Sequence, residues 1–134
     1  MADRVSETAR KLRLGCEMAL VYARVRLQVR RRPLPDLLRV LRRGVADPVG
    51  VERLAVARQL GWTVHRHLPR LPGDTRCLTQ SLVLTGLLAR REIGSLLVIA
   101  VGPSEDFVAH AWVEHDGVPL LPTGGDEFGR LVSL

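Results

Sequence analysis

The chain has 134 residues, 46% of them hydrophobic, which fits one domain with a substantial apolar core. The net charge is +6, but only 4% of residues are aromatic, which argues against a stacking platform for single-stranded nucleic acid. No apolar run approaches the roughly 18 residues that span a bilayer, and residues 1–13 lack the apolar stretch of a signal peptide. We therefore expect a soluble cytoplasmic protein.

The chain contains two cysteines, Cys16 and Cys77, and they do not suggest a disulfide framework. A disulfide between them would be unusual in a cytosolic protein. The chain has no Cys-x-x-Cys and no His-x-x-x-His pair, which are common spacings for zinc ligands. The sequence therefore predicts no metal or other cofactor.

Residues 4–32 are expected to form one long helix. Apolar residues recur there at spacings of three and four, which predicts a single buried stripe. On that stripe, Cys16 would pack as a small, inert hydrophobe. Pro33 and Pro35 end the helix, because proline lacks an N–H and disfavours helix in the residue before it. The stripe consists of Leu12, Cys16, Ala19, Leu20, Ala23 and Leu27.

The positive charge is concentrated near the start of the chain. Residues 1–43 hold 12 basic side chains against four acidic ones. A basic arm of this kind could bind nucleic acid, an acidic partner or an acidic peptide. It could equally be the solvated face of a helix.

Two further helices are expected before Cys77. A short one covers residues 36–43, and a longer one covers residues 48–67, with Asp47-Pro48 as its N-cap and first-turn proline. His65 and His67 lie two residues apart and point to different sides of the helix, which makes them a poor metal pair. They are more typical of surface or capping histidines. The inward face of the longer helix should consist of Val51, Leu54, Ala57, Leu60, Val64 and Leu68.

A loop at residues 68–75 leads into an apolar helix from Cys77 to about residue 91. Asp74 or Thr75 can cap its start, and Gly94 ends it. Leucines surround much of its circumference, which predicts the most buried helix of the chain. These leucines are Leu78, Leu82, Leu84, Leu87 and Leu88.

The apolar period then changes to that of strands. Residues 96–101 form a continuous apolar run of strand length, and residues 107–115 read as a second strand. Asp116-Gly117 is a strong hairpin signal, followed by a third strand at residues 118–121. Residues 130–134 are expected to form a final edge strand. The prediction is an α+β fold, with N-terminal helices followed by a small antiparallel sheet packed on the cysteine helix.

Cys77 and His110 can together perform nucleophilic chemistry. A thiol attacks as the thiolate, which is favoured by the positive end of a helix and by a nearby imidazolium. With His110 as the base, Cys77 could attack an amide carbonyl and form a thioester, and the N–H groups at the start of the helix would stabilise the oxyanion. From the residues alone, a packed cysteine and a strand histidine without a catalytic role remain the simpler interpretation.

A third group should orient the imidazole of His110. If Asp116 and Gly117 form the turn, His115 pairs with Val118, and the count continues until His110 faces Thr123. An acid just beyond the third strand could then reach the histidine, and Asp126 is the nearest candidate. Glu114 shares the strand face of His110 but lies four residues along it, roughly 13 Å away.

Two blocks of the sequence carry a family resemblance: Cys77-Leu-Thr-Gln-Ser-Leu-Val-Leu-Thr-Gly-Leu-Leu-Ala-Arg-Arg91 and Ala109-His-Ala-Trp-Val-Glu-His-Asp-Gly117. They closely resemble the transglutaminase-like leader peptidases of lasso-peptide biosynthesis. These are the second B component of gene clusters in which the B function is split. The resemblance covers residues 48–121 and is specific through the two blocks.

The resemblance implies a papain/transglutaminase-like cysteine peptidase that removes the leader from a ribosomally made precursor before macrolactam closure. Cys77 is then the nucleophile and His110 the base. The family's acid usually follows the histidine by about a dozen residues, where this chain has Pro122 and Thr123, and Asp126 is the best substitute. Residues 48–134 would be the catalytic core and residues 1–47 a basic helical part of the single domain 1–134.

The resemblance also implies partners. These are the precursor's leader peptide, a small leader-recognition protein and an asparagine-synthetase-like cyclase, with no nucleic acid and no membrane. Two alternatives stay open. One is a non-catalytic basic module for nucleic acid or an acidic partner, and the other is a transglutaminase-like acyltransferase that uses the same thioester.

Overall fold

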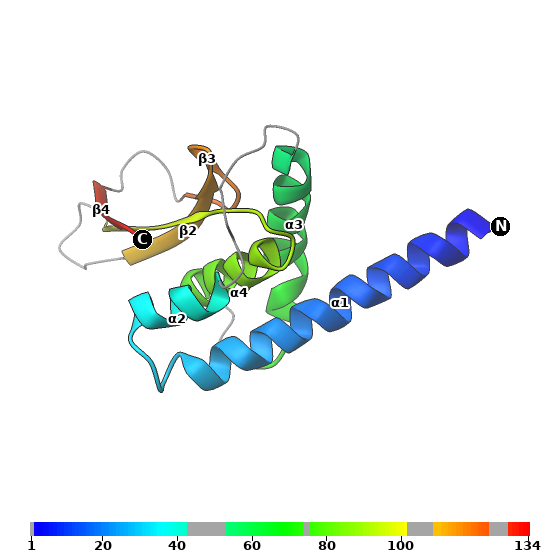
Figure 1. The fold of residues 1–134 in the computed structure, drawn as a ribbon, viewed down its shortest axis with the longest axis horizontal. Helices are drawn as coiled ribbons and strands as arrows, with labels where there is room; N and C mark the ends of the chain where they lie inside the picture. Colours follow the sequence, from blue (N-terminus) through cyan, green and yellow to red (C-terminus); the bar gives the residue numbers. More distant parts are fainter. Residues whose placement is uncertain (1, 43–52, 74–75, 102–108, 124–128) are drawn as a thin grey trace.

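The computed structural model describes residues 2–42, 53–73, 76–101, 109–123 and 129–134. Helices come first and the strands follow, so the predicted α+β class is confirmed (Figure 1). The expected cap at Asp47-Pro48 and the inward position of Val51 lie outside the described residues. The elements are α1 (Ala2–Gln28), α2 (Leu34–Leu41), α3 (Leu54–His67), a 3-10 turn η2 (Leu68–Arg70), α4 (Cys77–Ala89), β1 (Leu96–Val101), β2 (Ala109–His115), β3 (Val118–Pro119) and β4 (Gly129–Ser133).

The strands form an antiparallel sheet in the order β3-β2-β1-β4, which confirms the expected final edge strand. The hairpin prediction also holds, since Asp116 (φ 51°) and Gly117 (φ 76°) adopt the left-handed conformation that a tight turn requires. His115 pairs with Val118 as predicted. The third strand is shorter than expected and ends at Pro119.

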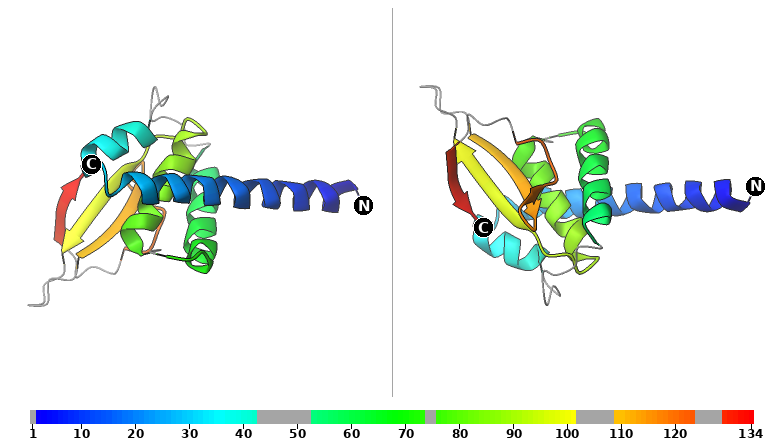
Figure 2. Two further views of the ribbon diagram at one scale, coloured as in Figure 1. Left: turned by 90° about the horizontal axis from the view of Figure 1, so that it is seen from below. Right: turned by 90° about the horizontal axis from the view of Figure 1, so that it is seen from above.

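Helix α4 is the centre of the molecule, as its leucines predicted. Every residue from Ser81 to Ala89 is buried, and α1, α2, α3 and β2 all contact this helix (Figure 2). Its two buried hydroxyls bond back to the preceding turn: Ser81 Oγ donates to the Cys77 carbonyl at 2.7 Å, and Thr85 Oγ1 to the Ser81 carbonyl at 2.8 Å. Both buried hydroxyls therefore have a hydrogen-bond acceptor within the helix.

The end of α4 differs from the prediction that Gly94 stops it. The helix ends at Ala89, and the left-handed residue of the following turn is Glu92 (φ 58°). The Ile93 N–H donates to the Leu88 carbonyl at 2.9 Å and closes that turn. A backbone hydrogen-bond pattern, rather than the glycine, terminates the helix.

The predicted buried stripe of α1 is wrong. Leu12 and Leu27 are 66% and 62% exposed, and Cys16 is exposed as well, so it is not the inert core thiol that its spacing suggested. A second apolar series on the same helix faces the core instead. It consists of the half-buried Leu14 and the buried Met18, Val21, Tyr22 and Val25.

Helix α3 presents the face that its period predicted. Ala57, Leu60, Val64 and Leu68 are all buried, with Leu54 half-buried at the start of the helix. Helix α2 begins and ends two residues earlier than expected. Among the described helices, none is both long enough and apolar enough to cross a bilayer.

Candidate active site

Cys77 is the first residue of α4. The N-cap is Arg76, without a side-chain cap hydrogen bond, and the expected caps Asp74 and Thr75 lie outside the described residues. The Gln80 N–H closes the first helical turn on the Arg76 carbonyl at 2.9 Å. The N–H groups that precede Gln80 therefore have no acceptor within the helix and form its positive end around the thiol.

Cys77 and His110 line the same pocket, which has a volume of about 160 Å³. The cysteine comes from the start of α4 and the histidine from β2, two elements that pack on each other. Cys77 is half-buried, so its thiol is open to the pocket. The remaining lining residues are His65, Gln80, Ala111, Leu121 and Pro122.

A backbone carbonyl holds the imidazole of His110. Its Nε2 lies 2.6 Å from the carbonyl oxygen of Pro122. A carbonyl can only accept a hydrogen bond, so Nε2 carries the hydrogen and Nδ1 carries the lone pair of the neutral ring. The predicted register placed Thr123 opposite His110. The ladder stops at Pro119, and the chain instead brings in the preceding residue's carbonyl.

Gly61 lets this carbonyl segment lie against α3. A Cβ at Gly61 would collide with the backbone carbonyl of Leu120, two residues before Pro122. Glycine is unfavourable inside a helix, so its presence here indicates a close approach of another backbone. Helix α3 therefore sets the path of the chain that holds His110.

Trp112 and Glu114 lie on the same face of β2 as His110. The rings of His110 and Trp112 are 6.0 Å apart between centroids, at 36° to each other. Trp112 Nε1 donates to Glu114 Oε2 at 2.9 Å, and both side chains are buried. The acid that shares the strand face of His110 therefore accepts a hydrogen bond from the tryptophan between them.

His65 was interpreted from the sequence as a surface or capping residue, and the structure adds it to the pocket. Its Nδ1 lies 3.3 Å from Gln80 Oε1, and Gln80 is one turn after Cys77 on α4. His65 directly follows the buried Val64, so it sits at the edge of the packed face of α3. His67 points elsewhere and meets the Trp62 ring edge-on at 6.0 Å between centroids.

Asp126, the predicted acid, lies outside the described residues. Among the residues that are described, no three His, Cys, Asp or Glu side chains are arranged to hold a metal ion. The pocket offers a thiol, two imidazoles, a carboxamide and the N–H groups at the start of α4. These groups are suited to nucleophilic attack on a carbonyl with stabilisation of the oxyanion.

A comparison with protein families identifies one match. The family model described as "Transglutaminase-like superfamily" matches residues 19–133. This range includes both Cys77 and His110 and leaves residues 1–18, the start of α1, outside the match. No curated protein and no solved structure gives a match.

Proposed function

Because the chain belongs to the transglutaminase-like superfamily, we propose that it is a cysteine peptidase that removes the leader from a ribosomally synthesised lasso precursor peptide before macrolactam closure. One observation carries the proposal: Cys77, at the positive end of α4, lines the same pocket as His110. The sequence blocks around these two residues resemble the lasso leader peptidases, which favours this substrate over other amides.

The reaction proceeds in two steps. His110 Nδ1 accepts the thiol proton of Cys77, and Sγ attacks the scissile carbonyl. The tetrahedral adduct collapses to a thioester while the imidazolium donates its proton to the departing amine of the core peptide. Water, deprotonated by the same imidazole, then attacks the thioester, which releases the leader carboxylate and restores the thiol.

Two sets of donors can stabilise the oxyanion of the adduct. The first is the group of N–H donors at the start of α4, which lack acceptors within the helix. The second is the carboxamide of Gln80, which lines the pocket one turn after the nucleophile. His65 contacts the oxygen of that carboxamide, so we assign His65 a positioning role.

The orienting group of His110 has two candidates. Pro122 supplies its carbonyl to Nε2 at 2.6 Å, and this contact favours the tautomer that the mechanism requires. Asp126 remains our proposed acid, because it follows the same segment by four residues. Asp126→Asn should leave cleavage nearly unchanged if the Pro122 carbonyl suffices, and should lower it about 100-fold if the carboxylate stabilises the imidazolium.

We further propose that the chain acts with partners. The substrate would be the leader region of the precursor, delivered by a small leader-recognition protein. An asparagine-synthetase-like cyclase would then use the new N-terminus of the core. These assignments follow from the resemblance of the two sequence blocks.

Leader cleavage by the purified chain tests the proposal. The chain, the recognition protein and the precursor are mixed, and the released core is identified by mass spectrometry. Cys77→Ala should abolish cleavage, because no other group in the pocket can form the thioester. Cys16→Ala is the matched control: Cys16 is the chain's other free cysteine, it is exposed, and its removal should leave cleavage at the parental level. Full cleavage by Cys77→Ala would disprove the proposal.

The superfamily assignment is also compatible with acyl transfer, because the same thioester can be attacked by an amine. A primary amine added to the cleavage reaction separates the two outcomes. A peptidase yields the leader with a free carboxylate. An acyltransferase yields the amide of the added amine, which has a different mass.

A further inference from the structure

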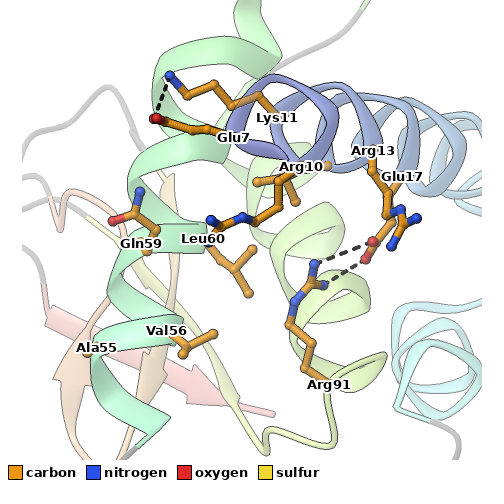
Figure 3. A pocket seen from close by; sticks show the side chains of 11 residues that line it. Glu7, Arg10, Lys11, Arg13, Glu17, Ala55, Val56, Gln59, Leu60 and Arg91 are labelled. Carbon is orange, nitrogen blue, oxygen red and sulfur yellow. Dashed lines mark hydrogen bonds and ion pairs between the residues drawn. The ribbon is translucent and has the colours of Figure 1, made fainter. Parts of the chain in front are cut away.

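A groove of about 570 Å³ lies between the N-terminal half of α1 and helix α3, away from the cysteine pocket (Figure 3). Leu14 contributes apolar surface from α1, and Val56 and Leu60 contribute it from α3. Val56 is 46% exposed, so the α3 wall presents an apolar side chain to solvent. The groove therefore has apolar side chains on both walls, as is typical of surfaces that hold a partner's side chains.

The rim of the groove has an excess of positive charge. Its lining includes four basic and two acidic side chains. Lys11 pairs with Glu7 at 3.2 Å, and Arg91 pairs with Glu17 at 2.7 Å. The other two basic side chains, Arg10 and Arg13, have no ion pair or hydrogen bond with any residue that the structure describes. Figure 3 shows Arg10 extending from α1 toward α3.

The α1 wall is poorly supported by the rest of the fold. Residues 3–13 are exposed throughout, and this part of the helix projects beyond the body of the molecule (Figure 1). An isolated helix of this length is marginally stable in water, and packing normally stabilises it. Residues 3–13 also lie outside the segment that matches the superfamily, so the α1 wall of the groove is an addition to the matched segment.

We propose that this groove binds an acidic amphipathic helix of a partner protein. Its apolar face would cover Leu14, Val56 and Leu60, and its carboxylates would pair with Arg10 and Arg13. A flat membrane surface would not fill a concavity between two helices. Nucleic acid offers phosphates but no apolar side chains to cover Leu14, Val56 and Leu60.

The position of the groove leaves the cysteine pocket open when a partner is bound. Val56 lines the groove, and His65 lines the pocket. The two residues are nine positions apart on α3, which is about two and a half helical turns, so their side chains leave opposite sides of the helix. Binding of a partner in the groove therefore does not require the proposed peptidase activity.

Binding of a synthetic probe tests the groove. The probe is a labelled helix of about 16 residues, or about four turns, with leucines on one face and glutamates on the other. Its fluorescence anisotropy is measured as the full-length chain is added. Arg10→Glu combined with Arg13→Glu should raise the Kd at least about tenfold, and Val56→Glu should do the same. Arg30→Glu combined with Arg31→Glu is the matched control, because it makes the same charge change at two exposed sites outside the groove and should leave the Kd within about twofold.

Three results would overturn the proposal. One is equal binding of a glutamate helix without leucines, because charge alone would then explain the interaction. Another is an equal loss of affinity in the variant that carries Arg30→Glu and Arg31→Glu. The third is tighter binding of phosphatidylglycerol vesicles or duplex DNA than of the probe, with the same dependence on Arg10 and Arg13. Circular dichroism of each variant verifies that α1 is still helical.

Discussion

Helices α1 and α4 are both rich in apolar residues and each carries one cysteine, yet the fold treats them in opposite ways. All residues of α4 from Ser81 to Ala89 are buried, whereas residues 3–13 of α1 are all exposed. Cys16 lies on an apolar stripe of α1 and is exposed, and Cys77 is the first residue of the buried helix and lines a pocket. For α1, burial therefore follows from the neighbours that the helix acquires, not from its own pattern.

The sequence of α1 contains two apolar series, which is why its periodicity predicts the wrong buried face. The series through Leu12 and Cys16 is offset by two residues from the series through Leu14 and Met18. Two residues correspond to about 200° around a helix, so the two series lie on opposite sides. The packing of α1 on α4 selects the second one.

The largest expected effect concerns the chemistry on the α4 side of the molecule. In the proposed mechanism the Cys77 thiol loses its base in His110→Ala, so this variant should lower the rate of leader cleavage by about 100- to 10,000-fold. His65→Ala should lower it about tenfold or less, since His65 only contacts the Gln80 side chain. The rates come from time courses by mass spectrometry, and a larger loss in His65→Ala would reverse the two roles.

The next effect compares leucines of the two helices. Leu84→Ala removes a fully buried side chain of α4 and should lower the free energy of unfolding by about 2–5 kcal/mol. Leu12→Ala removes a side chain of α1 that is 66% exposed and should change it by less than about 0.5 kcal/mol. Urea denaturation measures both, and equal losses would mean that the outer stripe of α1 is packed in solution.

Adding a methyl group at one glycine of each helix tests the same difference in packing between α4 and α1. A Cβ at Gly86 would lie 2.8 Å from Val21 Cγ1, where α1 crosses α4, so Gly86→Ala should destabilise the fold by about 1–3 kcal/mol. A Cβ at Gly15 meets nothing within 4 Å, so Gly15→Ala should stabilise α1 by about 0.5–1 kcal/mol. Thermal unfolding should show opposite shifts in Tm, and shifts of the same sign would contradict the observed crossing.

The smallest effect concerns the ion pairs of α1. Glu17 is mostly buried and pairs with Arg90 and Arg91 at the end of α4, so Glu17→Gln should cost about 1 kcal/mol. Glu7 pairs with Lys11 in an exposed position, and Glu7→Gln should cost about 0.3 kcal/mol. Added salt should shrink both losses, and the Glu7 loss should disappear first. A larger loss in Glu7→Gln would contradict this ranking.

The elements that carry Cys77 and His110 were predictable from the sequence, and the other groups around these two residues were not. Cys77 follows a loop and opens an apolar run, and His110 lies on a strand beside a strong turn signal, so both positions are local properties of the chain. Pro122 and His65 reach the site from other segments. The prediction of Asp126 extends the residue pairing of the hairpin beyond the third strand, but the described strand pairing ends at Pro119.

By itself, the sequence determined the order and type of the elements, the burial of α4 and the hairpin at Asp116-Gly117. These depend on hydrogen bonds and periodicity among residues close in the chain. Only the tertiary structure decided which face of α1 is buried and which carbonyl holds the imidazole. These choices depend on contacts between distant segments, such as Glu17 with Arg91, 74 residues apart. Local patterns allow several such contacts, and chain packing selects one.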